Sequence, residues 1–199
     1  TVSGEEADQL KKILQKKQVR FSVNEDLIGE IWQDRPALSC EPVMELDVKW
    51  AGKSRADKIQ EIRTKLKEKG ASFFVLTSLD DIAWLLNIRG NDIHCCPVVL
   101  SYLVLDEKEI RLFANEKAFP ESVKKALSAD GVTIYPYNDI YDYVQTMSGE
   151  KKIYLSRSNV NSRLISNIPE KVTILDGENL TLLPKAIKNE TEIQNEKIA

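Results

Sequence analysis

The spacing of hydrophobic positions changes along the chain, and these changes predict its elements. Residues 73–77 are apolar almost without interruption, as in a strand that is covered on both faces. Residues 54–69 instead repeat apolar positions at the period of a helix and place Ile59, Ile62 and Leu66 on one side of it. The two patterns together predict a helix that is followed by a buried strand.

Capping and turn residues mark the ends of the predicted helices. Ser54 and Asp57 form the S-x-x-D pattern of a helix start, and Gly70 stands where a helix ends in the left-handed conformation. Ser78 precedes a further apolar helical pattern that ends near Asn87. These signals agree with the spacing and fix two helices on either side of the buried strand.

Further along, the chain predicts a hairpin and then a regular alternation of elements. Residues 98–105 and 109–114 are rich in strand-forming residues, and the polar link between them is short enough for an antiparallel hairpin. Helical patterns then alternate with strand patterns, with helices over 120–129, 139–147 and 159–167 and strands over 132–135, 151–156 and 172–175. We therefore predict an α/β fold in which a mixed sheet of about six strands is flanked by helices.

The first 48 residues show a different pattern and predict a short helical N-terminal extension. One helix is expected over residues 5–17 and a second after Asn24, which can cap it. The apolar residues of the second helix are expected to form a buried stripe; they are Leu27, Ile28, Ile31 and Trp32. Residues 37–52 show no period and contain several breakers, which favours an extended connector.

Three segments follow from this pattern. Residues 1–48 are predicted to be a helical extension with its connector, and residues 49–184 a complete domain. Residues 185–199 begin a new helical pattern, which we interpret as the start of a helix that leads into a further, absent domain with nothing here to pack on.

Composition excludes several classes of function. The 28 basic and 31 acidic residues give a net charge of −3, which does not favour binding to nucleic acid or anionic lipid. The longest apolar runs are far too short to span a membrane, so no membrane partner is expected. Three cysteines form neither a disulfide framework nor a metal-ligand spacing, which favours a reducing, cytoplasmic location.

The residue types also argue against a metal or cofactor site built by this chain alone. A peptidase metal centre needs several carboxylates, and usually imidazole, around one or two ions. His94 is the only histidine, and no H-E-x-x-H or comparable cluster is present. The sequence therefore predicts no metal and no cofactor within these residues.

A thiol nucleophile is a separate hypothesis, because His94 immediately precedes Cys95 and Cys96. Successive side chains of an extended segment point to opposite faces, whereas a base must lie within hydrogen-bonding distance of its nucleophile. We therefore interpret one or two cysteines as small buried side chains at a strand entrance, with His94 partly exposed. A stand-alone thiol enzyme stays open as the third functional hypothesis.

Four stretches in order along the chain resemble the Xaa-Pro aminopeptidase (aminopeptidase P) family, within the creatinase and prolidase group. They are L-I-x-x-I-W-x-D-R-P at 27–36, W-A-G-x-S-x-x-D-K-I-x-x-I at 50–62, L-D-D-I-A-W-L-L-N-I-R-G-N-D-I-H-C-C-P at 79–97 and L-P-K-A-I-K-N-E-T-E at 183–192. The sequence departs from the family at Cys96, which stands before Pro97 where an asparagine is common. Cysteine lacks the amide's donors and acceptor, which puts a local turn bond in doubt.

The resemblance implies a non-catalytic domain of a larger peptidase. It implies that residues 1–48 are the tail of a preceding domain with its linker, and that residues 185–199 begin the linker or helix into an absent catalytic domain. The family's catalytic domain holds two divalent metal ions, manganese or zinc, and cleaves the bond between an N-terminal residue and a following proline. None of its metal ligands is carried onto this sequence. The resemblance further implies a homodimer, proline-containing peptides as substrates, and a role for this domain in dimer assembly and in narrowing access to the active site. The alternative is a peptidase-like scaffold that binds peptides or proteins without catalysis.

Within this picture, Arg89 and Asp92 are the candidate residues of a substrate-facing loop, with His94 as a third. A cation and an anion at the end of an element could face the two termini of a peptide. The competing interpretation is an internal Arg89–Asp92 pair that fixes the loop.

Overall fold

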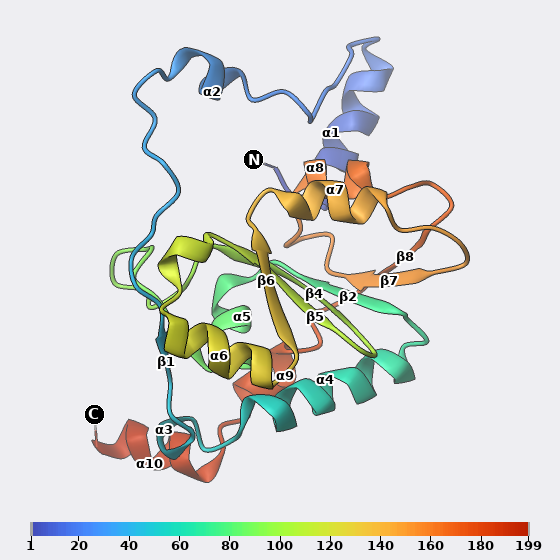
Figure 1. Ribbon diagram of the computed structural model, residues 1–199. Coiled ribbons are helices and arrows are strands. Elements are labelled where there is room, and N and C mark those ends of the chain that lie inside the picture. Colours follow the sequence, from blue (N-terminus) through green and yellow to red (C-terminus); the bar gives the residue numbers. More distant parts are fainter. Residues whose placement is uncertain (1, 199) are drawn as a thin grey trace.

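A six-stranded mixed sheet forms the centre of the protein (Figure 1). The computed structural model describes residues 2–198, so Thr1 and Ala199, the outer ends of the first and third predicted segments, lie outside it. The strand order is β6-β5-β4-β2-β7-β8, and β4 alone runs antiparallel to its neighbours. The strands are β2 (Phe73–Leu76), β4 (Ser101–Asp106), β5 (Ile110–Ala114), β6 (Val132–Pro136), β7 (Lys152–Leu155) and β8 (Thr173–Asp176). The predicted hairpin is β4–β5, so the predicted fold class is confirmed.

Helices cover both faces of the sheet, and this explains the uninterrupted apolar run of β2. Phe74 and Leu76 point into one core cluster, whereas Phe73 and Val75 point into the other, as the two-residue period of a strand requires. One face is covered by α4 (Arg55–Glu68), α5 (Leu79–Leu86) and α6 (Glu121–Ala129), and the other by α7 (Asp139–Gln145) and α8 (Ser162–Asn167). A single turn of 3₁₀ helix, η1 (Glu116–Ala118), precedes α6.

The predicted boundaries of α4 and α5 match the structure. The Ser54 hydroxyl accepts a hydrogen bond from the Asp57 amide at 3.1 Å, and Gly70 follows α4 in the left-handed conformation at φ +64°. Asn87 ends α5 in the same conformation, at φ +50°. Asparagine tolerates this conformation better than most residues. The Asn87 side chain also accepts a hydrogen bond from Lys58.

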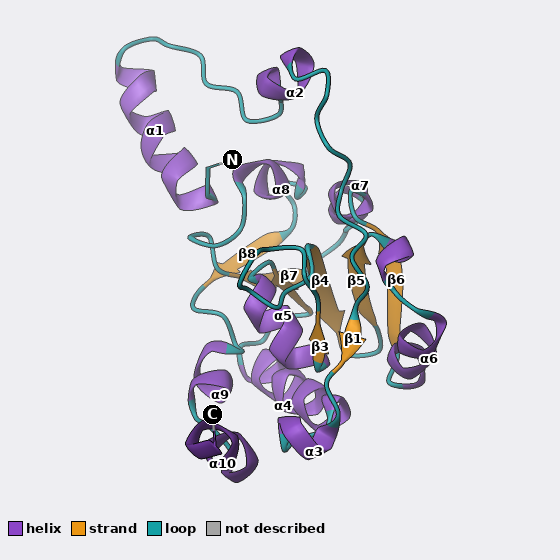
Figure 2. Ribbon diagram, turned by 90° about the vertical axis from the view of Figure 1, so that its left-hand side faces the viewer, coloured by secondary structure: helices purple, strands orange, loops and turns teal. Residues whose placement is uncertain are grey.

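The second helix of the N-terminal extension differs from the prediction because its apolar residues are not covered. The extension contains α1 (Gly4–Lys16) and α2 (Leu27–Ile31), which stands away from the sheet in Figures 1 and 2. The expected buried stripe is wrong for the described residues, since its members are exposed: Leu27 61%, Ile28 64%, Ile31 77% and Trp32 45%. The cap is Asp26, which accepts from the Gly29 amide at 3.0 Å, and not Asn24. Helical spacing shows which face is apolar, but not whether another element covers it.

The stretch expected to be an extended connector contains structure that belongs to the sheet-centred body. It forms β1 (Met44–Glu45), which pairs antiparallel with β3 (Ile88–Arg89), and then α3 (Val48–Ala51). Val43 is 2% exposed, and its amide donates to the Ala118 carbonyl at 2.8 Å. Two-residue strands are too short to produce a period in the sequence, so this pairing had no local signal.

The C-terminal pattern forms two helices where one was predicted, and the second one does have a packing partner. They are α9 (Leu182–Ala186) and α10 (Glu190–Ile198), separated by an Asn189 cap. The Asn189 side chain accepts from the Glu192 amide at 3.0 Å, and the Glu192 carboxylate accepts from the Asn189 amide at 2.9 Å. This reciprocal N-x-x-E arrangement is a capping box, and it stops α9 from continuing. Helix α10 packs against α3.

Candidate functional site

The last turn of α5 is surrounded by three positively charged side chains. The final carbonyls of a helix have no partner within the helix and carry the negative end of its dipole, so cations are favourable there. Each cation donates to a different carbonyl: Arg55 Nε to Leu86 at 2.6 Å, Lys58 Nζ to Trp84 at 3.0 Å and Arg89 Nη1 to Ala83 at 3.1 Å. Because Arg55 and Lys58 lie on α4 and Arg89 on β3, this turn joins three elements.

Arg55 is the most completely paired of the three. It is 4% exposed, and its guanidinium makes ion pairs of 2.6 Å with Glu45 of β1 and with Asp130, which follows α6. A further donor bond goes to the Ala126 carbonyl at 3.1 Å. The buried charge of Arg55 is therefore compensated on two sides, as a buried ion pair requires.

Lys58 is more deeply buried and lacks such a carboxylate. It is 2% exposed, and Nζ donates to Asn87 Oδ1 at 2.7 Å in addition to the Trp84 carbonyl. The same nitrogen lies 4.4 Å from the centroid of the Trp84 ring, which adds a cation–π contact. Burial lowers the pKa of Lys58 to about 8, although the negative charge of Glu192 opposes this shift and the positive charge of Arg89 adds to it.

Asp92 holds the loop that follows β3, and the three residues predicted there do not form a cluster. Its Oδ2 accepts from the Leu100 amide at 2.7 Å, while Oδ1 is buried with no hydrogen-bond partner among residues 2–198. Arg89 points instead to the end of α5, and burial lowers its pKa. The predicted internal Arg89–Asp92 pair does not occur within 4.0 Å in the described part of the chain. His94 is exposed at the tip of the loop.

The tip is a tight turn that places both cysteines in solvent. The Cys96 amide donates to the Ile93 carbonyl at 3.0 Å, and Cys95 adopts φ +61° within the turn. Cys95 and Cys96 are exposed, so the interpretation of these cysteines as small buried side chains is wrong. The segment turns back before β4 begins, so it does not lead directly into a strand. The sequence did not indicate this turn, because cysteine is not a residue that favours the left-handed conformation.

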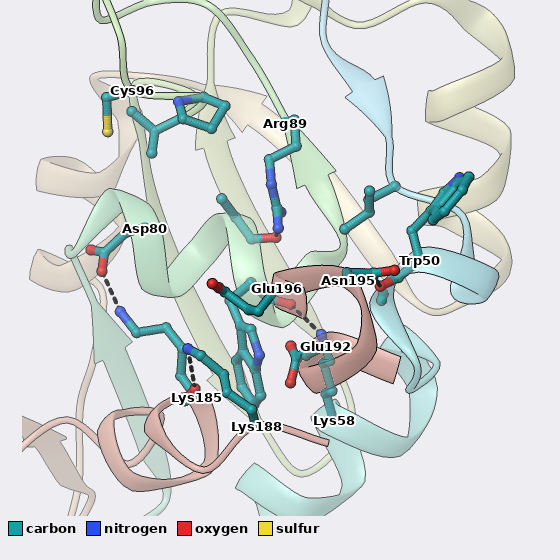
Figure 3. A pocket seen from close by; sticks show the side chains of 16 residues that line it. Trp50, Lys58, Asp80, Arg89, Cys96, Lys185, Lys188, Glu192, Asn195 and Glu196 are labelled. Atoms are coloured by element: carbon teal, nitrogen blue, oxygen red, sulfur yellow. Dashed lines mark hydrogen bonds and ion pairs between the residues drawn. The ribbon is translucent and has the colours of Figure 1, made fainter. Parts of the chain in front are cut away.

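A hollow of about 540 Å³ lies between α5, α10 and the segment that follows the turn (Figure 3). Arg89 reaches into it from β3 and Lys58 from α4, while Glu192 and Glu196 approach from α10. Two tryptophans, Trp50 and Trp84, contribute aromatic surface. Of these residues the sequence indicated only Arg89 as functional, because no motif links positions as distant as 58, 89 and 192.

This set of residues does not fit a metal centre. The described residues contain no group of three or more His, Cys, Asp or Glu side chains arranged to hold an ion. The acids of the hollow lie among four cations, which would repel a divalent metal. We therefore assign no metal-dependent step to these side chains. In the same described range, none of the helices has both the length and the apolar character needed to cross a membrane.

Comparison with known proteins identifies the fold family. Residues 34–192 match the family of the creatinase/prolidase N-terminal domain. The chain belongs to this family. Over 96% of its length this creatinase/prolidase domain is 36% identical to Xaa-Pro aminopeptidase 1 of Dictyostelium discoideum, and over 97% it is 35% identical to the probable Xaa-Pro aminopeptidase P of Leptosphaeria maculans.

A solved structure gives the same result. The domain superposes on X-prolyl aminopeptidase from Caenorhabditis elegans, a cytosolic enzyme with a di-nuclear active site, with a TM-score of 0.88 and 30% sequence identity. The match covers 99% of this chain and 33% of that one, and the chain likewise spans about a third of the two curated relatives, 32% and 33% of their lengths. The resemblance to Xaa-Pro aminopeptidases is therefore confirmed, for a region that makes up about a third of those enzymes.

Burial of Lys58 predicts a measurable dependence of stability on pH. Its folded pKa of about 8 lies below the ordinary value of 10.5, so the unfolded chain binds more protons between these two values. The free energy of unfolding should therefore rise with pH across this window, by up to about 3 kcal/mol. Urea unfolding at pH 7.5 and pH 10 should show this rise in the natural protein and not in Lys58→Met. Tyrosine titration changes the stability of both proteins alike, so it cancels when the free energy of unfolding of Lys58→Met is subtracted from that of the natural protein. A value of this difference that does not change with pH would contradict the prediction.

The conformation of Cys95 predicts opposite effects for two substitutions. A residue with a Cβ atom at φ +61° carries a penalty of roughly 1–2 kcal/mol, from which glycine is free. Glycine also adds entropy to the unfolded chain, so Cys95→Gly should raise the free energy of unfolding by no more than about 1 kcal/mol. Cys95→Val should lower it, because β-branched residues are the least tolerant of positive φ. Cys96→Val is the matched control, since Cys96 has no positive φ. Equal destabilisation by both Cys95 variants would contradict the assignment.

Proposed function

We propose that the chain is a non-catalytic domain of a metal-dependent Xaa-Pro aminopeptidase, which removes an N-terminal residue that precedes proline. The observation that supports this most is the likeness to the di-nuclear X-prolyl aminopeptidase, which extends over 99% of the chain at 30% identity. In this proposal the two divalent ions, manganese or zinc, bind in another region of the parent enzyme. The parent is cytoplasmic and acts on proline-containing peptides.

The domain's own contribution is access control and assembly. The loop that carries Arg89, Asp92 and His94 supports the first role, because it ends in an exposed turn beside a hollow. A substrate-facing loop needs polar groups at its rim and a fixed base, and Asp92 anchors this one to the backbone before β4. In the parent enzyme this loop would exclude long substrates from the active site.

The activity assignment is tested by comparing the 199-residue chain with its parent protein. We expect the parent to release the first residue of an Ala-Pro-Phe peptide in the presence of Mn²⁺ or Zn²⁺, and the chain alone to release none under the same conditions. Liquid chromatography of the products measures both. Cleavage by the pure chain would contradict the non-catalytic role. A parent that binds the peptide without cleaving it would instead support a scaffold.

The assembly role rests on the exposed apolar side of α2. An uncovered stripe of this kind is typical of a surface that another body covers, and we assign it to the homodimer contact of the parent. Ile31 is the most exposed member, at 77%.

Ile31→Asp should therefore weaken dimerisation of the parent enzyme, because a carboxylate at a buried contact loses its hydration. Sedimentation velocity should show a dimer for the natural parent and an increase in monomer of tenfold or more for the variant at micromolar concentration. Ile13→Asp, on α1, is the control for an equally drastic change at an exposed isoleucine. An unchanged dimer in Ile31→Asp would remove α2 from the interface.

A further inference from the structure

Four cations line the hollow: Lys58, Arg89, Lys185 and Lys188. Lys58 and Arg89 are buried or half-buried and have donors that the described chain does not use. An ammonium group has three N–H donors, and Lys58 directs two of them to Trp84 and Asn87. Arg89 bonds only through Nη1, to the carbonyls of Ala83 and Ile88. Its Nε and Nη2 groups have no hydrogen-bond partner among residues 2–198, which leaves free the edge of the guanidinium that binds a carboxylate with two parallel bonds.

These two cations also lack a counter-ion at contact distance. Within the described residues, neither Lys58 nor Arg89 has a carboxylate oxygen within 4.0 Å. The contrast with Arg55 is direct, since that side chain has two carboxylates at 2.6 Å. Lys58 is buried and Arg89 is half-buried, so neither charge is fully screened by water, and together they give this side of the hollow a positive potential.

The shape and lining of the hollow limit what can bind there. A volume of about 540 Å³ lies within the range of small-ligand sites, roughly 300–1,000 Å³. Trp84, Pro97 and Val98 add apolar surface to the lining of the hollow. The lining contains four cations and three acids, which are Asp80, Glu192 and Glu196, so its formal net charge is +1. This charge favours a monoanion over a phosphate.

We propose that this hollow binds the C-terminal carboxylate of a short peptide, with the free edge of Arg89 holding both oxygens and Lys58 supplying a second positive charge. The apolar walls receive the side chain of the last peptide residue. The site goes beyond the function proposed above, because it requires binding by this chain and no cleavage. It can therefore succeed or fail independently of the peptidase assignment.

The test is a titration of the 199-residue chain with the peptide Ala-Pro-Leu as the free acid and as the C-terminal amide. Calorimetry measures the affinity, and quenching of Trp50 and Trp84, which line the hollow, provides an independent signal. We expect the acid to bind at least tenfold more tightly than the amide, and Arg89→Gln to remove this preference. Arg89→Lys should also lose most of it, because lysine keeps the charge but not the planar fork.

Arg20→Gln is the matched control. It changes the net charge by the same amount at an exposed position outside the hollow, and it should leave both affinities unchanged. Equal binding of acid and amide, an unaltered preference in Arg89→Gln, or no binding of the acid at millimolar concentration would each overturn the proposal. Inorganic phosphate that displaces the peptide more effectively than acetate does would overturn the carboxylate assignment.

A second variant tests the site without altering its cations. Glu192→Gln removes the nearest competing negative charge, and glutamine still serves in the capping box with Asn189. The free acid should bind Glu192→Gln at least threefold more tightly than it binds the natural chain. Weaker binding would overturn the proposal. This result does not depend on whether Arg89→Gln disturbs the end of α5.

Discussion

The end of α5 is the constraint on which the rest of this domain depends. Its last carbonyls are buried between the sheet and α4, where water cannot satisfy them, so donors must come from the protein. Arg55 and Lys58 provide them from the first turn of α4, and Arg89 provides one from β3. The bonds that satisfy the helix therefore also fix how α4, α5 and β3 lie relative to one another.

The three cations differ in how their charge is balanced. This difference distinguishes a cation that only stabilises the fold from cations that are available to a ligand. Arg55 connects β1 and the end of α6 through two close carboxylates, so its charge is used within the fold. Lys58 and Arg89 satisfy the same helix end but retain unpaired charge on the side of the hollow. Cations suit the negative end of α5, and a bound anion of the kind proposed above would balance the charge that stays unpaired.

Local signals in the sequence were sufficient to predict the central sheet but not the residues of the site. β2 was predictable because every one of its side chains is buried, and α4 because Ser54 and Gly70 mark its ends. The exposure of Ile31 was not predictable, since amphipathic spacing is the same whether or not a partner covers the helix. The hollow brings Lys58 and Glu192 together across more than a hundred residues, and only the completed fold creates that proximity.

Helix α10 is attached to α3 by hydrogen bonds. Asn189 donates to the Ala51 carbonyl and Asn195 to the Trp50 carbonyl, each at 2.9 Å. A hydrogen bond contributes about 1 kcal/mol net, and no described residue of α10 is buried, so these bonds hold the helix less strongly than burial of an apolar face would. The same helix carries Glu192 opposite two uncompensated cations, which attract it toward α5. Helix α10 therefore carries the acid whose charge acts on both Lys58 and Arg89 across the hollow.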